Sequence, residues 1–425
     1  MTGAGGVLMC RWQPELAAVL ADLRINRYLI LDSFDRRGAI DSAVLAPFDR
    51  VYHISSCDSL EELAAVACDL LVSGAVIDTV LSHHEFSQLG AAYLEQALVR
   101  DPTALRHSAA QRDKRLMKAR VRRHGVATAE FVSFPERGDT KALAEVAQRL
   151  TFPVVLKPAM GFGTMDTMRV DTFDELAVIV GGHVVNPLIK SKQLVVEEFV
   201  AGREVCVDAL WHEGRCLSFV VHEYLQPKLK LNERTTVAAP VVDGSCILDP
   251  AVNASLYGEL RDLQGSVNEA LGIRRGATHM EVFVRADGGL VFGEIANRIG
   301  GIWIPMMLSE YFGRDIWRVL AEAHMFGEGP AANPGRRCVG GVNIRPSSPG
   351  VICAMPTAEE LNRVDGVLRW VVVNGVGARA RLAHPAEQYL MLVIAAADHA
   401  EFKERCRRLE EQLVIEVASA EKNMV

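Results

Sequence analysis

Short apolar runs alternate with amphipathic stretches over the first hundred residues of the chain. Arg27–Asp32 and Arg50–Ile54 combine aromatic and aliphatic residues, as buried strands do. Leu60–Leu71 and Phe86–Val99 carry apolar residues at helical spacing instead. Strands that alternate with helices form parallel sheets, so the hydrophobic pattern predicts an N-terminal β/α lobe that ends near residue 110.

The hydrophobic pattern changes after this lobe. Asp113–His124 has helical spacing, and Gly125 follows where a glycine commonly ends a helix. Phe131–Phe134 then predicts a strand, and Thr140–Leu150 predicts a helix. Further along, most of the expected elements are strands, with one helix at Val252–Leu271. The expected strands are Phe152–Lys157, Leu194–Phe199, Val205–Trp211, Cys216–His222, His279–Arg285 and Leu290–Ile295.

A third unit follows after about residue 337. It contains the expected strands Val342–Arg345, Leu368–Val373 and Tyr389–Ala396 and a charged helix at His399–Leu413. The fold class is therefore α/β with α+β character. We expect three lobes at residues 1–110, 111–335 and 336–425, with a small lid lobe at about residues 125–200 inside the second.

Composition and charge narrow the class of protein. The chain has 425 residues, of which 49% are hydrophobic and 23% charged, as in a soluble protein of several domains. A net charge of −7 argues against general binding of nucleic acids, and we interpret the basic run Arg112–Arg123 as a solvated helix face. The start of the chain lacks the features of a secretory signal, and the longest apolar run is too short for a membrane helix.

Cysteine usage indicates the compartment. The chain has 9 cysteines and no CxxC pair, so a disulfide framework is not expected and a reducing cytoplasm fits best. A homodimer is the default expectation for the oligomeric state.

The segment His279–Arg298 carries the most chemical information. Two strand-like runs flank Asp287-Gly288, which predicts a hairpin with a two-residue turn. In that register Glu281 lies opposite Glu294, and like charges at opposite positions destabilise a sheet unless a cation compensates them. Carboxylates suit Mg²⁺, which commonly keeps phosphate oxygens as further ligands. The hairpin therefore predicts a Mg²⁺ site that carries a nucleotide phosphate; two exposed glutamates on a solvated hairpin are the alternative.

Two other segments could contact such a nucleotide. In Phe152–Arg169, Lys157 ends a strand and precedes a loop with Gly161 and Gly163, although the Walker A motif is absent. A lysine can hold a phosphate, and glycines let backbone N–H groups approach it. In Leu194–Glu204, a strand end, apolar residues and a glutamate could accommodate adenine and ribose. An ordinary hairpin turn and a surface strand end are the respective alternatives.

Five motifs taken together resemble the ATP-grasp superfamily. In order, they are DK at a helix start, VVLKP before a glycine-rich loop, VVEEFVAGRE, GATHMEVFV and VFGEIANRIGG, and they cover about residues 110–305. Within the superfamily, GATHMEV, EIANRIGG and IRPSSPGVI resemble the carboxylate–amine ligases that make dipeptides, the L-amino acid ligases. The resemblance implies an ATP-grasp fold with an N-terminal β/α lobe, a central nucleotide-binding part and a C-terminal lobe.

The resemblance also implies which residues bind ATP. The phosphate contacts would come from Lys114, Lys157, Lys228 or Lys230 and from the loop residues Met160, Gly161, Gly163 and Thr164. The adenine-binding hinge would consist of Glu197, Glu198, Phe199 and Val200, with Glu204 at the ribose.

Further roles concern the metal and the substrates. Glu281 and Glu294 would hold Mg²⁺, or Mn²⁺ in its place. Asn297 is a candidate third ligand, although many relatives have this asparagine one position earlier, where this chain has alanine. Arg298 would bind the substrate carboxylate and then the acyl phosphate. His279 and Trp303 would lie near the substrate, and His279 is either a candidate base or a structural histidine.

The implied reaction is ATP-dependent ligation. A small-molecule carboxylate would be activated as an acyl phosphate and attacked by an amine, which gives an amide, ADP and phosphate; amino acids are the expected substrates. One alternative is an ATP-grasp ligase or carboxylase of purine or cofactor metabolism. Another is a non-catalytic ATP-binding regulatory protein, against which the intact metal glutamates and Arg298 argue.

Overall fold

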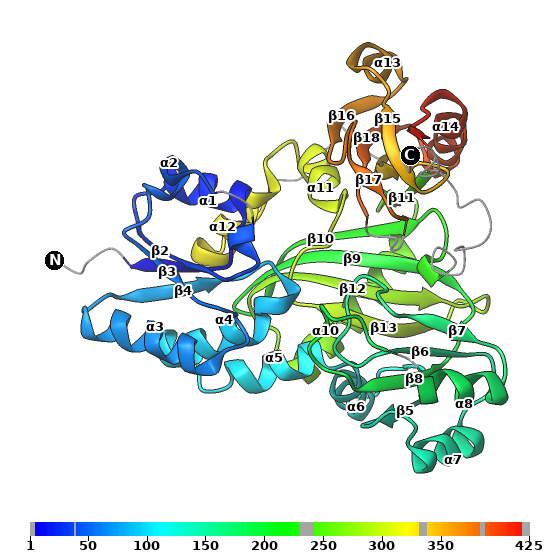
Figure 1. Cartoon of the computed structure of the whole chain (residues 1–425), viewed down its shortest axis with the longest axis horizontal. Coiled ribbons are helices and arrows are strands. Elements are labelled where there is room, and N and C mark those ends of the chain that lie inside the picture. Colours follow the sequence, from blue (N-terminus) through cyan, green and yellow to red (C-terminus); the bar gives the residue numbers. More distant parts are fainter. Residues whose placement is uncertain are drawn as a thin grey trace, which may run out of the picture.

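The computed structural model describes residues 5–37, 40–182, 184–229, 242–330, 338–382 and 387–418. Its helices and strands confirm the predicted α/β fold class, and the described strands form four sheets (Figure 1). Lys230 lies outside the described residues, so its expected contact with phosphate stays a prediction. No helix in the described ranges is both long and apolar enough to cross a membrane.

The first sheet is parallel throughout, which confirms the parallel sheet predicted for the N-terminal part. Its strands, in spatial order, are β3 (Arg50–His53), β2 (Asn26–Leu31), β1 (Gly6–Cys10) and β4 (Ile77–Leu81). The helices of this part are α1 (Pro14–Ala21), α2 (Ser42–Leu45), α3 (Leu60–Val72) and α4 (Gln88–Leu94), with a short 3₁₀ turn at Glu85–Ser87.

Alternation along β1 explains how both faces of this sheet are covered. Leu8 and Cys10 pack with α3 and α4, whereas Val7 and Met9 pack with α1 and with Ala321 of α12 (Ile316–Phe326). Because α12 comes much later in the chain, this packing fastens the N-terminal sheet to the central part of the molecule.

The second sheet is small and antiparallel. Its strands, in spatial order, are β5 (Phe131–Phe134), β8 (Leu194–Glu198), β6 (Val154–Pro158) and β7 (Met168–Val170). They share one core with α7 (Thr140–Arg149) and α8 (Phe173–Gly182). This unit occupies the stretch of sequence where we expected the lid lobe.

An antiparallel sheet of eight strands forms the centre of the molecule. Its strands, in spatial order, are β13 (Leu290–Ala296), β12 (Gly276–Val284), β9 (Arg203–His212), β10 (Arg215–Tyr224), β11 (Val242–Ile247), β14 (Cys338–Ile344), β18 (Leu390–Ala396) and β16 (Val367–Val372). The helices α5 (Ala104–Arg112), α6 (Lys114–Arg123) and α10 (Ala254–Leu271) share a core with one face. The other face packs against α11 (Ile304–Phe312) and α12.

The C-terminal part shares this large sheet. β11 pairs with β14, so the sheet continues across the lobe boundary expected at residues 335 and 336. The remaining elements are β15 (Gly350–Ala354), β17 (Arg379–Ala380) and β19 (Glu416–Ala418), which form the fourth sheet, and α13 (Ala358–Arg363) and α14 (His399–Gln412). The three-lobe division of the chain therefore stays a proposal.

The turn between β12 and β13 differs from the prediction. Arg285 N–H bonds to the Gly289 carbonyl at 3.0 Å, which leaves a three-residue loop between them in place of the two-residue turn. Gly288 adopts a φ of 84°, the left-handed conformation that commonly closes such a loop. The predicted two-residue turn is therefore wrong.

The predicted pairing of the two glutamates is nevertheless confirmed, because a second irregularity cancels the first. A β-bulge after Glu281 shifts the register by one residue and leaves Gly293 without a partner on β12. Glu281 therefore pairs with Glu294, as the sequence predicted. A side chain at Gly293 would meet the Glu281 carbonyl oxygen at 2.9 Å, so the bulge requires glycine.

We expect Gly293→Ala to destabilise the protein by about 1–3 kcal/mol, because the added methyl group must displace backbone. Gly265→Ala in α10 is the matched control: nothing lies within 4 Å of the new methyl group. Alanine should stabilise that helix by roughly 0.5–1 kcal/mol. Urea denaturation of both variants would measure the difference. Equal free energies of unfolding for the two variants would contradict the inferred crowding at the bulge.

Candidate active site

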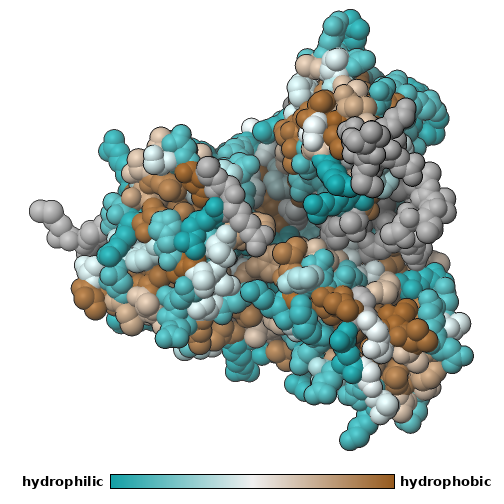
Figure 2. Space-filling model, in the orientation of Figure 1, coloured by the Kyte–Doolittle hydropathy of each residue, from teal (hydrophilic) through white to brown (hydrophobic). Residues whose placement is uncertain are grey.

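A large cleft lies where the sheets meet, and Figure 2 shows the surface hollowed there. Its volume is about 1540 Å³. A pocket for one small ligand commonly has roughly 300–1,000 Å³, so this cleft has room for more than one molecule. Its walls come from the first sheet's loops, the small sheet and the face of the large sheet that carries Glu281 and Glu294.

Three lysines and two glutamates form a charge cluster at the inner end of the cleft. Lys157 Nζ lies 3.0 Å from Glu197 Oε2 and 3.8 Å from Glu294 Oε2. Lys118 Nζ lies 3.4 Å from Glu197 Oε2, and Lys114 Nζ lies 3.4 Å from Glu294 Oε2. These side chains come from α6, β6, β8 and β13, so the cluster joins the small sheet to the large one.

Mutual attraction within this cluster keeps its members charged. Burial alone would raise the pKa of Glu197, but Lys118 and Lys157 outweigh it and lower that pKa. Burial would lower the pKa of Lys157, and Glu197 and Glu294 raise it instead. For Lys118 burial prevails, and its pKa falls to about 8. The cluster therefore holds fixed charges, and Glu294 is its most exposed member, with 28% of its side chain accessible to water.

The basic run on α6 is not a uniformly solvated helix face, contrary to our interpretation. Arg112 at the end of α5 and Lys114 and Lys118 of α6 are buried at the cleft, whereas Arg123 of α6 is exposed. Lys114 and Lys118 are four residues apart, which places both on one side of the helix. The sequence analysis missed Lys118, although this spacing from Lys114 could have indicated it.

Lys118 also explains why the bulge in β13 matters for the site. Its Nζ donates to the Gly293 carbonyl oxygen at 2.7 Å. That carbonyl belongs to the bulged residue, which has no partner on β12. The bulge and Lys118 together position the neighbouring Glu294 at the cleft.

The glycine-rich loop after β6 borders the cleft as predicted. Gly161, Gly163 and Thr164 line it, whereas Met160 does not; the Met160 carbonyl accepts a hydrogen bond from Arg112 at 3.2 Å. Lys114 Nζ donates to the Gly161 carbonyl at 2.8 Å, so this lysine holds the loop as well as Glu294. Lys157 lies at the start of the loop, in the cleft wall.

An aromatic contact closes the loop against the first sheet. Phe162 meets Phe86 edge to face, with ring centroids 4.6 Å apart. Phe86 follows β4, so this contact links the loop to the N-terminal part of the chain.

The predicted hinge residues also lie at the cleft. Glu197, Glu198, Phe199, Val200 and Glu204 all line it. Glu197 belongs to the charge cluster, and its other oxygen, Oε1, is buried without a hydrogen-bond partner. A buried acceptor of this kind is costly unless a ligand supplies a donor, and the amino group of adenine is one. This end of the cleft therefore offers an acceptor to a ligand that carries an N–H or O–H donor.

Glu204 and Lys228, which both line the cleft, contact each other. The backbone N–H of Lys228 donates to Glu204 Oε2 at 3.1 Å, while its Nζ lies 2.7 Å from Asp243 Oδ2. Burial and the neighbouring Glu281 raise the pKa of Glu204 to about 8. The Lys228 ammonium is held by Asp243 and by the rings of Tyr224 and Trp303.

The two metal-site glutamates suit a divalent cation. Glu281 and Glu294 pair across the ladder, line the cleft and have about a quarter of their side-chain surface exposed. Two carboxylates on one wet wall, beside lysines that could hold phosphates, are the oxygen donors that Mg²⁺ prefers.

The position of Asn297 contradicts its predicted role as a metal ligand. It does not line the cleft, and its buried Oδ1 lies near Gly276 at the far end of β12. Successive side chains of a strand point to opposite faces, so the residue on the same face as Glu294 is Ala296, which does line the cleft. Sequence reasoning placed Asn297 by proximity along the chain and overlooked this alternation.

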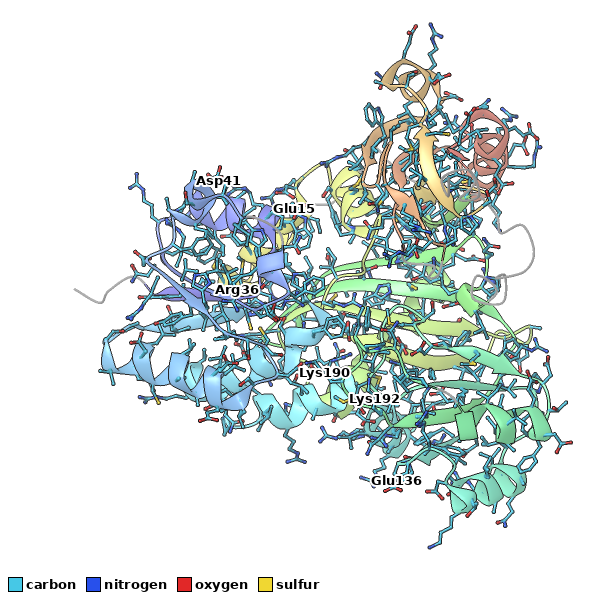
Figure 3. All side chains as sticks on the ribbon, viewed as in Figure 1. Glu15, Arg36, Asp41, Glu136, Lys190 and Lys192 are labelled. Carbon is cyan, nitrogen blue, oxygen red and sulfur yellow. The ribbon has the colours of Figure 1, made fainter. Side chains whose placement is uncertain are left out.

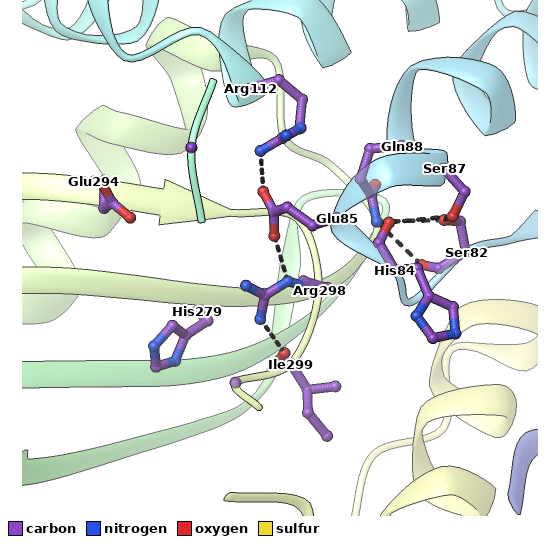
Figure 4. Close-up of polar contacts among 12 residues, drawn as sticks. Ser82, His84, Glu85, Ser87, Gln88, Arg112, His279, Glu294, Arg298 and Ile299 are labelled. Atoms are coloured by element: carbon purple, nitrogen blue, oxygen red, sulfur yellow. Dashed lines mark hydrogen bonds and ion pairs between the residues drawn. The ribbon is translucent and has the colours of Figure 1, made fainter. Parts of the chain in front are cut away.

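Arg298 lies at the cleft and shares a buried carboxylate with Arg112, as Figure 4 shows. Its Nε lies 2.5 Å from Glu85 Oε2, and Arg112 contacts Glu85 Oε1. Burial would raise the pKa of Glu85, but the two guanidinium groups outweigh it and lower that pKa to about 2. Glu85 comes from the loop after β4, and nothing in its sequence context indicated this role.

His279 is part of a buried network. Asp208 accepts from His279 Nδ1 at 3.2 Å, from His222 Nε2 at 2.8 Å and from the Gly300 N–H at 2.9 Å. Burial would lower the pKa of His279, but Asp208 raises it well above the ordinary value. Asp208 therefore fixes the orientation of the ring and leaves Nε2 for other contacts, and the role of His279 as a base stays a prediction. Asp208 and His222 were not anticipated from the sequence.

Trp303 lies in the cleft wall and is nearly fully buried. Its Nε1 donates to Ser245 Oγ at 2.8 Å, and its ring packs with α11 and α12. The indole therefore forms a fixed wall beside Lys228, which also lines the cleft.

Comparisons with known proteins agree with the resemblance in the sequence. Residues 150–306 match the family model of the ATP-grasp domain. Over 325 residues, or 75% of each chain, the sequence is 27% identical to an L-arginine-specific L-amino acid ligase of Bacillus subtilis.

Solved structures share the fold over nearly the whole chain. An L-amino acid ligase from Bacillus licheniformis has a TM-score of 0.73 at 18% identity, covering 99% of this chain and 100% of that one. A phosphoribosylglycinamide synthetase from Anaerococcus prevotii has a TM-score of 0.66 at 15% identity, covering 98% and 100%. At these identities the likeness concerns the fold alone.

Replacing Glu85 tests the bridge to the two arginines. Because the pKa of Glu85 is lowered, its charge stabilises the fold above the ordinary value of 4.5, and this contribution is lost as the pH falls towards about 2. We expect Glu85→Gln to cost roughly 2–4 kcal/mol at neutral pH, since two buried guanidinium groups lose their counter-charge.

The stability gap between wild type and Glu85→Gln should narrow as the pH falls below about 4.5, and thermal melts at several pH values would measure it. Glu145→Gln is the matched control, because Glu145 pairs with Arg149 on an exposed helix surface. A gap that does not change with pH would contradict the assigned charge.

Proposed function

We propose that this chain, which belongs to the ATP-grasp superfamily, is an ATP-dependent ligase that joins an amino acid, or a similar carboxylic acid, to an amine. One observation carries the proposal: a facing glutamate pair, a lysine cluster and a buried arginine all line one cleft. The pair suits a cation, the lysines suit phosphates and the arginine suits a carboxylate.

ATP would lie between the small sheet and the large one. Lys114, Lys157 and the backbone of the glycine-rich loop would hold its phosphates, and Glu197 to Val200 would contact the adenine. Mg²⁺, or Mn²⁺ in its place, would bind at Glu281 and Glu294 and neutralise charge on the phosphates. Contact of Phe162 with Phe86 would keep the loop closed and exclude water from the reacting groups.

Arg298 would orient the acid. Glu85 holds the Nε edge of its guanidinium, and Figure 4 shows another nitrogen pointing toward the side where His279 and Glu294 lie. A carboxylate bound there could attack the γ-phosphorus in line, which breaks the bond to ADP and forms an acyl phosphate. The amine would then attack the acyl carbon, phosphate would leave, and the nitrogen would lose one proton.

The residues that line the outer end of the cleft favour amino acids over phosphorylated sugars as substrates. Its walls contain Glu15, Asp22, Glu310 and Asp315 as well as arginines. Figure 3 marks Glu15 on the side of the N-terminal part that faces the C-terminal part. Arg318 pairs with Asp22 and Arg314 with Glu322, so these charges compensate one another, and Arg369 is a further cation in the wall. Acidic side chains suit the amino groups of amino acids, whereas a sugar phosphate would need uncompensated cations.

Two further expectations belong to this proposal. A cytoplasmic location fits an enzyme that consumes ATP and has only free cysteines among the described residues. A homodimer remains the default expectation for the assembly.

A phosphate-release screen of carboxylic acids crossed with amines, read by mass spectrometry, would test the proposed function. We expect amide products that depend on ATP, with amino acids among the accepted substrates. ATP turnover without any amide product across the panel would overturn the ligase assignment.

Glu294→Gln should lower ADP release at least about 100-fold, because an electrostatic contact made in the transition state is lost. Circular dichroism should show an intact fold. The matched control is Glu259→Gln, which changes an exposed glutamate on α10 and should leave turnover unaltered. Substantial turnover in Glu294→Gln would refute the metal role.

Arg298→Lys keeps the buried positive charge that Glu85 needs but removes the guanidinium nitrogen that points toward the side of His279 and Glu294. We expect kcat/KM for the carboxylate substrate to fall about 100-fold, with little change in nucleotide affinity. Steady-state kinetics and calorimetry with ATP would separate the two effects. Arg274→Lys, at a residue whose side chain is 70% exposed, is the control. Equal losses for acid and nucleotide would contradict the assignment.

A further inference from the structure

A second group of potential metal ligands lies beside the proposed Mg²⁺ site, where Cys206 pairs with Glu281. One ligand atom each of Cys206, His222 and His279 lies within 4.8 Å of the other two, and all three side chains are buried. The residues occupy the neighbouring strands β9, β10 and β12, where Cys206 pairs directly with His222. Rigid sheet backbone therefore fixes their separation.

Asp208 holds both imidazole rings through its carboxylate. It bonds His222 through Nε2 and His279 through Nδ1, which leaves His222 Nδ1 and His279 Nε2 as the possible ligand atoms. His222 is fully buried, and its Nδ1 has no hydrogen-bond partner. A carboxylate on the far nitrogen of a histidine is the common support of histidine ligands in metal sites.

We propose that Cys206, His222 and His279 form a binding site for a transition-metal ion of the Zn²⁺ type, supported by Asp208. Tetrahedral bonds of roughly 2.0–2.3 Å place ligand atoms ~3.3–3.8 Å apart, so small side-chain movements would complete the site. The Cys206 thiolate and the Asp208 carboxylate would balance the two positive charges of the ion.

This site is chemically distinct from the glutamate pair. Thiolate and imidazole ligands select Zn²⁺ and similar ions, whereas carboxylates suit Mg²⁺. His279 lines the cleft, and its Nε2 lies 3.7 Å from Glu281 Oε1. A bound ion would thus lie next to the cleft, where Glu281 or water could supply its fourth ligand. Filling the site would engage His279 and Glu281, which both line the cleft.

Co²⁺ is a suitable spectroscopic probe, because thiolate binding produces an intense charge-transfer absorption. Titration of the purified full chain with Co²⁺ in excess Mg²⁺ should give one equivalent of bound ion with this absorption, and Zn²⁺ should displace it. X-ray absorption of the Zn²⁺ form should find one sulfur and two imidazole ligands. These readouts do not depend on ligase activity, so failure of the metal site would leave the proposed function untouched.

Variants test the ligand set. Cys206→Ser should abolish the charge-transfer absorption and lower affinity at least about 100-fold, and Asp208→Asn should lower it about 10–100-fold. Cys353→Ser, at an exposed cysteine in β15, is the matched control and should bind as wild type does. Absorption retained in Cys206→Ser, or wild-type protein without a sulfur ligand to the ion, would overturn the proposal. The wild-type spectrum decides the matter even if Cys206→Ser does not fold.

Discussion

The site depends on two carboxylates that are held charged at the inner end of the cleft. Glu197 and Glu294 come from different sheets, and Lys114, Lys118 and Lys157 neutralise them. Each of these groups would be costly to desolvate alone, so each member lowers the cost of burying the others. The cluster therefore helps to fix how the small sheet lies against the large one, because Lys157 and Glu197 come from the small sheet and Glu294 from the large one.

Backbone geometry supports the same arrangement. The bulge at Gly293 exposes a carbonyl that Lys118 binds and directs Glu294 into the cleft. Glu85 connects the loop after β4 to Arg298 and Arg112, and Phe86 packs on the glycine-rich loop. Three distant parts of the chain therefore meet through a few desolvated contacts, and together they would enclose ATP and the substrate carboxylate in one place.

Residues with a local signal could be predicted. Glycines near a strand-end lysine, paired glutamates in a hairpin and the glutamate-rich strand indicated the nucleotide site, and the structure brings these residues to one cleft. Lys118 could have been found from its helical spacing to Lys114. Asn297 was misplaced because neighbours along a strand face opposite ways, and the hairpin prediction reached the right pair only because a bulge compensated a longer turn.

The sequence by itself determined the fold class, the parallel first sheet and the order of the nucleotide-binding motifs, because hydrophobic periodicity and glycine positions act over a few residues. The tertiary structure alone decided that Glu85 would meet Arg298 and that Asp208 would join two histidines. Those pairs are far apart along the chain, and a buried charge finds its partner only after the elements that carry both have packed. Periodicity reports which side of an element is buried but not which distant charge lies opposite.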